Sequence, residues 1–125
     1  MKEILCRDCN DNVLIVIGLI QKIIEEVKVE EWKITEFEAA PVELGDWSGV
    51  GAFENDHISE VYIFSQRLSD EHTIILNTKE LVSLLKDARS VYYAEISSIC
   101  MDQINRISIF DGNIIKVSGY IEEIL

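Results

Sequence analysis

The sequence predicts one α+β domain over residues 1–125, with a mainly antiparallel sheet of about five to seven strands and two helices. Three observations support this fold class. Strand-like segments follow one another in groups, without the regular helical alternation of an α/β protein. Two segments have the apolar spacing of a helix. An Asp-Gly pair at positions 111 and 112 separates two apolar-rich runs, which indicates a tight hairpin.

The first predicted helix begins near Val13. Asp11 or Asn12 is expected to cap it, because either side chain can accept a hydrogen bond from a first-turn amide. The first half of the helix is apolar all round, which predicts a deeply buried start. From Ile20 onward the apolar positions narrow to a stripe. The β-branched residues at 13–17 leave a strand as the competing interpretation.

The next predicted elements are three strands, over residues 32–37, 58–65 and 72–76. In the first of them Trp32 and Ile34 point to one face, and the residues between and after them point to the other. Pro41 is expected to end this strand, because proline cannot donate a hydrogen bond to a sheet ladder. Glycines mark a loop over about residues 44–55. Residues 67–71 are expected to join the second and third strands.

The second predicted helix opens at Asn77 or Thr78, and Asn77 with Glu80 three residues later has the form of a capping box. Its core face comprises Leu81, Val82, Leu84, Leu85 and Ala88. A strand at 90–99 and a hairpin around residues 111–112 complete the predicted sheet. Gly119 allows the last segment, residues 120–125, to bend or to continue as an edge strand.

The charge of the chain is strongly acidic. It carries 23 Asp and Glu against 11 Lys and Arg, a formal net charge of −12. Eleven of the carboxylates and only two lysines lie between Glu25 and Glu60, so this segment carries −9 of the total. A molecule of this charge repels phosphate backbones and anionic membranes. The charge therefore argues against nucleic acid or membrane binding and favours a basic protein as partner.

The same acidic segment contains both tryptophans, the only proline and three of the six glycines. We predict a docking surface in which Trp47, within a glycine-rich loop, anchors a partner and carboxylates form the rim. The predicted partner-binding residues are Glu36, Glu38, Glu43, Asp46, Trp47, Glu54, Asp56 and Glu60. A linker between strands, and a solvated acidic face without function, are the simpler alternatives.

Thiols and imidazoles are the other candidate chemistry. Cys6 and Cys9 form one CxxC pair, but Asp8 between them would raise the pKa of a reactive thiol, and a zinc site needs two further ligands. Such ligands would have to come from distant segments, namely Cys100, His57 or His72. We therefore predict ordinary reduced thiols, with no cofactor, no metal and no catalytic residues.

The sequence predicts a cytoplasmic protein. An odd count of three cysteines is far from a disulfide framework and indicates a reducing compartment. Residues 1–9 lack the apolar core of a signal peptide. The longest apolar run, residues 13–20, is too short to span a bilayer. We expect a monomer or weak homodimer without membrane association.

Together these features predict an inhibitor that binds a basic protein. In size, charge and lack of catalytic machinery, rather than in a shared motif, the chain resembles bacterial immunity proteins, the cognate inhibitors that protect a toxin-producing cell. The resemblance implies a non-enzymatic protein that covers the active cleft of a basic, nuclease-type toxin, with carboxylates in place of substrate phosphates. Two alternatives stay open: a small metal-binding or redox protein built on the thiols and histidines, and a regulatory or assembly subunit that uses an exposed sheet edge such as residues 120–125.

Overall fold

The computed structural model describes residues 2–6, 12–41, 60–99 and 104–124 of the chain. Six strands form one sheet in the order β1-β6-β5-β4-β2-β3, and every neighbouring pair is antiparallel. The strands are β1 (Lys2–Leu5), β2 (Glu31–Pro41), β3 (Ile74–Asn77), β4 (Ala88–Ile99), β5 (Arg106–Phe110) and β6 (Ile114–Ser118). The predicted α+β class and antiparallel sheet are confirmed.

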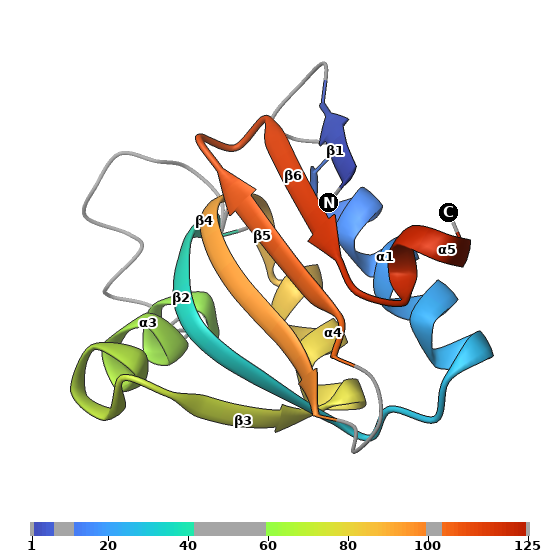
Figure 1. Ribbon diagram of the computed structural model, residues 1–125. Helices are drawn as coiled ribbons and strands as arrows, with labels where there is room; N and C mark the ends of the chain where they lie inside the picture. Colours follow the sequence, from blue (N-terminus) through green and yellow to red (C-terminus); the bar gives the residue numbers. More distant parts are fainter. Residues whose placement is uncertain (1, 7–11, 42–59, 100–103, 125) are drawn as a thin grey trace.

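The helices lie on one face of this sheet (Figure 1). In this view α1 (Asn12–Glu26) and α4 (Thr78–Lys86) lie behind the strands, α3 (Glu60–Glu71) packs beside β2, and the short α5 (Ile121–Ile124) contacts α1. None of the described helices covers the other face, on which Glu36, Glu95 and Lys116 lie. We call it the open face. Within the described ranges, no helix is both long and apolar enough to cross a membrane.

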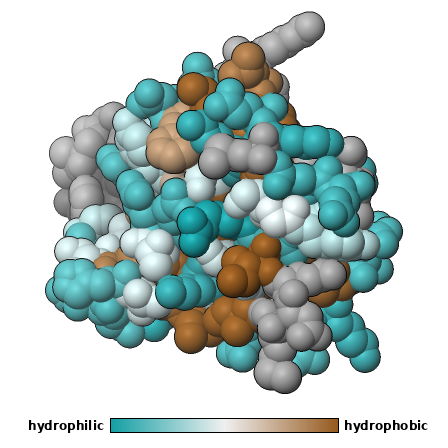
Figure 2. Space-filling view, viewed as in Figure 1, coloured by the Kyte–Doolittle hydropathy of each residue, from teal (hydrophilic) through white to brown (hydrophobic). Residues whose placement is uncertain are grey.

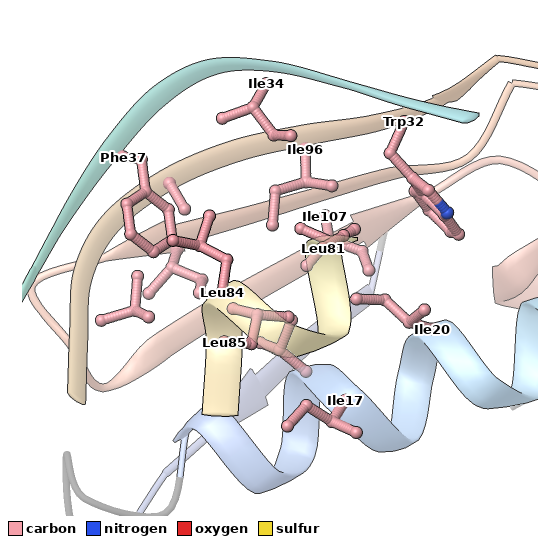
Figure 3. Close-up of a cluster of buried hydrophobic side chains, with 14 of the residues drawn as sticks. Ile17, Ile20, Trp32, Ile34, Phe37, Leu81, Leu84, Leu85, Ile96 and Ile107 are labelled. Carbon is pink, nitrogen blue, oxygen red and sulfur yellow. The ribbon is translucent and has the colours of Figure 1, made fainter. Parts of the chain in front are cut away.

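An apolar core fills the space between the sheet and the helices (Figure 3). Trp32 is fully buried there, and its indole N–H donates to Thr78 Oγ1 at 2.9 Å. The Thr78 hydroxyl in turn donates to the Val29 carbonyl at 3.1 Å. Because the indole nitrogen has a partner, the ring is buried without an unsatisfied donor. The other labelled core side chains are Ile17, Ile20, Ile34, Phe37, Leu81, Leu84, Leu85, Ile96 and Ile107.

Two local sequence signals act as predicted. The Asn77 side chain accepts a hydrogen bond from the Glu80 N–H at 2.7 Å, and the Glu80 carboxylate accepts one from the Asn77 N–H at 3.0 Å. These two bonds complete the capping box of α4. Asp111 and Gly112 turn the chain between β5 and β6 with φ values of 52° and 73°, the left-handed conformation of a tight hairpin. Strand β2 extends to Pro41, and the residues directly after it lie outside the described ranges.

The strand predicted over residues 58–65 is wrong. The part of this range that the structure describes is helical, and residues 67–71 continue helix α3 instead of forming a turn. Val61, Phe64 and Leu68 are the buried residues of α3, and their spacings of three and four put them on one side of a helix. The β-branched and aromatic residues favour a strand locally, but packing of this stripe against β2 and α4 decides the outcome.

Of the two alternatives predicted for residues 120–125, the bend is confirmed, and the edge strand is wrong for the residues that the structure describes. The chain bends at Gly119 (φ 99°), where a side chain would overlap the Ile104 carbonyl oxygen, and then forms α5. The Asn105 side-chain oxygen accepts a hydrogen bond from the Ile121 N–H at 2.7 Å and so fixes the start of this helix. The described part of the chain thus adds α3 and α5 to the two predicted helices.

A β-bulge in β2 decides which side chains face the helices. Thr35 is an extra residue between Ile34 and Glu36, each of which has its own partner on β4. Strict alternation from Ile34 would direct Glu36 and Glu38 toward the core. The extra residue shifts the phase, so Phe37 is buried and both glutamates are exposed on the open face.

Candidate docking surface on the open face

Four carboxylates gather on the open face, where β2, β4 and the β5–β6 turn meet. The strand register places Glu36 directly opposite Glu95 and Glu38 directly opposite Tyr93. Side chains in such positions have Cβ atoms about 4.5–5.5 Å apart. The Tyr93 hydroxyl donates a hydrogen bond to Asp111 Oδ1 at 2.5 Å. We call Glu36, Glu38, Glu95 and Asp111, together with Tyr93, the acidic cluster.

The acidic cluster is not neutralised from within the described part of the chain. None of its four carboxylates forms an ion pair with a described lysine or arginine. The pKa of Tyr93 is raised above its usual 10.0, first by the hydrogen bond to Asp111 and the charge of that carboxylate, and further by the charges of Glu38 and Glu36. The hydrogen bond favours the neutral phenol, and negative neighbours disfavour the phenolate. The Tyr93 hydroxyl therefore experiences a negative local potential.

Asn12 holds the β5–β6 turn against β4. Its side chain is fully buried, its Nδ2 donates to the carbonyls of Val91 at 2.5 Å and Gly112 at 2.8 Å, and its Oδ1 accepts from the Val91 N–H at 3.1 Å. The Gly112 N–H donates to the Tyr92 carbonyl at 3.0 Å. Asn12 thus joins three distant segments, and its side-chain oxygen accepts from Val91 and not from a first-turn amide of α1. These bonds fix the Asp111 carboxylate beside its tyrosine before any partner binds. Asp11, the other predicted cap, lies outside the described residues.

Aromatic and cationic groups surround the acidic cluster on the open face. Phe110 and Tyr92 are each 37% exposed, which leaves part of each ring available for contact. The Lys116 ammonium lies 5.1 Å from the centre of the Phe110 ring and 3.6 Å from the Glu3 carboxylate, so this cation is engaged away from the cluster. Figure 2, in the view of Figure 1, shows a mainly hydrophilic surface with separate hydrophobic patches.

Three of the eight predicted partner-binding residues lie in the described ranges. Glu36 and Glu38 come together in the acidic cluster. Glu60 does not join them, because it is the exposed first residue of α3 in the helical layer, where its carboxylate accepts a hydrogen bond from Ser83 Oγ at 3.4 Å. The other predicted residues lie outside the described residues, and they are Glu43, Asp46, Trp47, Glu54 and Asp56.

Sequence reasoning missed Tyr93, Glu95 and Asp111. The alternation along β4 places the first two on one face, and the Asp-Gly turn places the third at an end of the sheet. The missing information was the pairing of β2 with β4, which joins segments that are far apart in the sequence. A local pattern could therefore find each residue but not their proximity.

Cys6 is a buried thiol, and His72 is an exposed residue with φ 64° immediately after α3. The remaining candidate ligands lie outside the described residues, namely Cys9, Cys100 and His57. In the part of the chain that the structure describes, no three His, Cys, Asp or Glu side chains converge as a metal site requires.

No protein-family model, curated protein or solved structure matches this chain. What the acidic cluster can bind is therefore inferred from its carboxylates and its tyrosine. Carboxylates accept hydrogen bonds from lysine and arginine, and a guanidinium binds carboxylates with two parallel N–H donors. Opposed glutamates beside a tyrosine are therefore suited to binding a cationic protein surface.

Proposed function

We propose that this protein is a binding protein whose open face docks on a basic partner. The observation that carries this proposal is the Glu36–Glu95 pair, with Glu38 and Asp111 beside it and no ion-pair partner in the described ranges. Like charges directly opposite each other destabilise a sheet. A cationic side chain placed between them would remove the repulsion and form charge-assisted hydrogen bonds. The free protein therefore lacks an interaction that a basic partner would supply.

Within this class we propose an immunity protein, a cytoplasmic non-enzymatic inhibitor that covers the active cleft of a nuclease-type toxin. A nuclease needs a cationic cleft because its substrate is a polyanion. The carboxylates of the acidic cluster would occupy the positions of substrate phosphates. The net charge of −12 would also accelerate encounter with such a cleft, since opposite charges steer association.

Tyr93 would be the aromatic contact of this interface. Its phenol is neutral at physiological pH, as is usual for tyrosine, so the ring can pack on a partner while the hydroxyl stays bonded to Asp111. Tyrosine is among the residues most enriched in the energetic centres of protein interfaces. Because Asn12 fixes the turn that carries Asp111, little ordering is required on binding.

The test is capture followed by an activity assay. The immobilised protein is exposed to a lysate of its source cells at low salt, and any captured basic protein is purified and assayed for nuclease activity with and without the inhibitor. We expect inhibition at equimolar ratio. A captured protein whose activity is unchanged by the complex contradicts the immunity function.

A matched pair of charge-reversal variants tests the surface. Glu36→Lys/Glu38→Lys/Glu95→Lys alters the acidic cluster, whereas Glu25→Lys/Glu26→Lys/Asp70→Lys alters exposed carboxylates on α1 and α3 and changes the net charge equally. We expect the first variant to lower the association rate at low salt by about tenfold or more and the second to have a much smaller effect. Equal rates for the two variants would show that the partner senses only total charge.

A further inference from the structure

A row of apolar side chains crosses the open face from β1 to the acidic cluster. The strand register places Leu5 opposite Ile114, and Ile114 opposite Phe110. Ile114 lies two residues before Lys116 and therefore on the same, open face. Tyr93 continues the row on β4, one position beyond the last pair that β4 forms with β5. The strands β1, β6, β5 and β4 are neighbours in this order (Figure 1). We call Leu5, Ile114, Phe110 and Tyr93 the outer apolar row.

The outer apolar row exposes hydrocarbon to water. Leu5 is 73% exposed, Phe110 is 37% exposed, and Ile114 and Tyr93 are half-buried. Strand β1 forms an edge of the described sheet, so the row is open at its Leu5 end. Apolar residues scattered singly are ordinary on a protein surface, but a continuous apolar group bordered by polar residues is typical of an interaction site. The register makes these side chains continuous, which favours the second interpretation.

Negative charge is concentrated at the β4 end of the outer apolar row. Glu38 lies directly opposite Tyr93, and Asp111 accepts the hydrogen bond from the Tyr93 hydroxyl. At the other end of the row, Glu3 and Lys116 lie beside it on the open face and form an ion pair at 3.6 Å. The charges near β1 thus compensate each other, whereas those near β4 do not.

Two further cations on the open face do not cancel the negative charge. Lys33 and Arg106 both lie opposite Ser97, in the row beyond Glu36 and Glu95. Neither forms an ion pair with a carboxylate in the described ranges. These two cations are outnumbered by the four carboxylates of the acidic cluster. The cluster therefore attracts a cation to the β4 end of the outer apolar row.

The spacing of the strands sets the length of a segment that contacts both parts of this surface. Neighbouring strands are about 4.8 Å apart, so Glu38 on β2 lies about 19 Å across the sheet from Leu5 on β1. Alternate side chains of an extended segment are about 6.7 Å apart. Three apolar side chains at alternate positions, followed by a lysine or arginine, therefore extend over about 20 Å and match this distance.

We propose that the basic partner contacts the open face with an amphipathic segment. Its apolar side chains cover the outer apolar row, and its lysine or arginine binds the acidic cluster. This inference rests on the proposed function, because the acidic cluster selects the cation. It adds a second requirement, since a basic surface without adjoining apolar side chains would leave the row in water. The row thus allows the protein to discriminate its partner from other basic proteins.

The test uses a synthetic peptide with leucines at alternate positions and an arginine at one end, in an NMR titration of backbone amides. We expect saturable shifts in β1, β6, the β5–β6 turn and β4. A peptide with serines in place of the leucines, and one with citrulline in place of the arginine, should each bind at least severalfold more weakly. Absence of binding, or shifts centred elsewhere, would overturn the inference.

The two matched peptides separate this inference from the proposed function. If only the citrulline peptide binds more weakly, the acidic docking surface stands and the outer apolar row has no role, which overturns the inference alone. If the citrulline peptide binds as tightly as the leucine and arginine peptide, the acidic cluster does not select a cation, and the proposed function is contradicted as well. Concentration-dependent shifts of the same amides without peptide would show that a second copy of the chain covers the row, and would overturn the choice of partner.

Matched variants test the outer apolar row itself. Leu5→Ser should weaken binding of the leucine and arginine peptide about fivefold or more, through lost hydrocarbon contact. Leu14→Ser, at a 71% exposed position of α1, is the control and should leave binding unchanged. Ile75→Ser, at a 53% exposed position on the opposite edge of the open face, is a second control. All three side chains are exposed, so thermal unfolding should show intact folds. Equal effects of Leu5→Ser and either control would contradict the assignment.

Discussion

The two faces of the sheet differ in composition, as two adjacent rows of paired residues show. On the face toward the helices, one row across four strands consists of buried apolar residues, namely Ile34, Ile96, Ile107 and Val117. The adjacent row on the open face carries mainly charge, and it consists of Glu36, Glu95, Ser108, Lys116 and Glu3. The first row removes hydrocarbon from water and stabilises the fold. In the second row Glu36 and Glu95 place like charges opposite each other, so stability alone does not account for that pair.

The largest expected effect tests the inner face. Trp32→Ala removes a fully buried ring and the indole bond to Thr78, so we expect a loss of about 3–5 kcal/mol in the free energy of unfolding. Urea denaturation measures it. Ile75→Ala is the control from the open face, where the side chain is 53% exposed, and should change stability by no more than about 0.5 kcal/mol. Similar losses in the free energy of unfolding for the two variants would contradict the view that the inner face stabilises the fold more than the open face does.

The next effect concerns the hydrogen bonds by which buried Asn12 holds the β5–β6 turn of the acidic cluster. Asn12→Ala leaves the Val91 N–H and two carbonyls without their side-chain partner, and we expect it to cost about 3 kcal/mol. Hydrogen exchange of the Val91 amide should accelerate, because its acceptor is lost. Asn113→Ala, at an exposed position of the same turn, is the control and should have little effect. An unchanged Val91 exchange rate would contradict the role assigned to Asn12.

A smaller effect, of opposite sign, is expected on the open face. Glu95→Gln removes the charge opposite Glu36, so it should stabilise the protein by about 0.2–1 kcal/mol. The gain should decrease in high salt, which screens exposed charges. Chemical denaturation at two salt concentrations measures both effects, with Glu25→Gln on α1 as the control. A loss of stability in Glu95→Gln would show that this glutamate is structural.

The smallest effect is a change in titration. Asp111→Asn removes the main cause of the raised pKa of Tyr93, so this pKa should fall toward 10.0. The pKa of Tyr93 in the folded protein is above its value in the unfolded chain, so the interaction of Tyr93 with Asp111 contributes to the free energy of unfolding below pH 10. This contribution is lost as the pH rises through the folded-state pKa. Tyrosinate absorbance during alkaline titration measures the shift, and Tyr93→Phe identifies the tyrosine responsible. An identical curve for Asp111→Asn would show that the hydrogen bond is not populated in solution.

Much of this fold was predictable because its signals are local. The Asn77–Glu80 capping box and the Asp111–Gly112 turn each specify their own backbone geometry within a few residues. Helix α3 was missed because its β-branched and aromatic residues favour a strand, whereas the helix is selected by long-range packing of its buried side, which includes Phe64 on Phe37 with ring centroids 5.4 Å apart.

The acidic cluster was only half predictable. Charge counting found Glu36 and Glu38 because both lie in the most acidic segment. Glu95 and Asp111 come from less acidic surroundings and join them through sheet pairing and through the bonds of Asn12. Such long-range contacts depend on the whole topology, which no short window of sequence contains.

The bulge at Thr35 sets a rule for changes in the length of β2. Deleting this one residue would remove the bulge and leave Ile34, Glu36, Phe37 and Glu38 in strict alternation, so Phe37 would still face the core and both glutamates the open face. The shortened chain should therefore fold with the same two faces. Related chains that keep an acidic outer surface are accordingly expected to tolerate the loss of one residue here, and the replacement of the threonine itself.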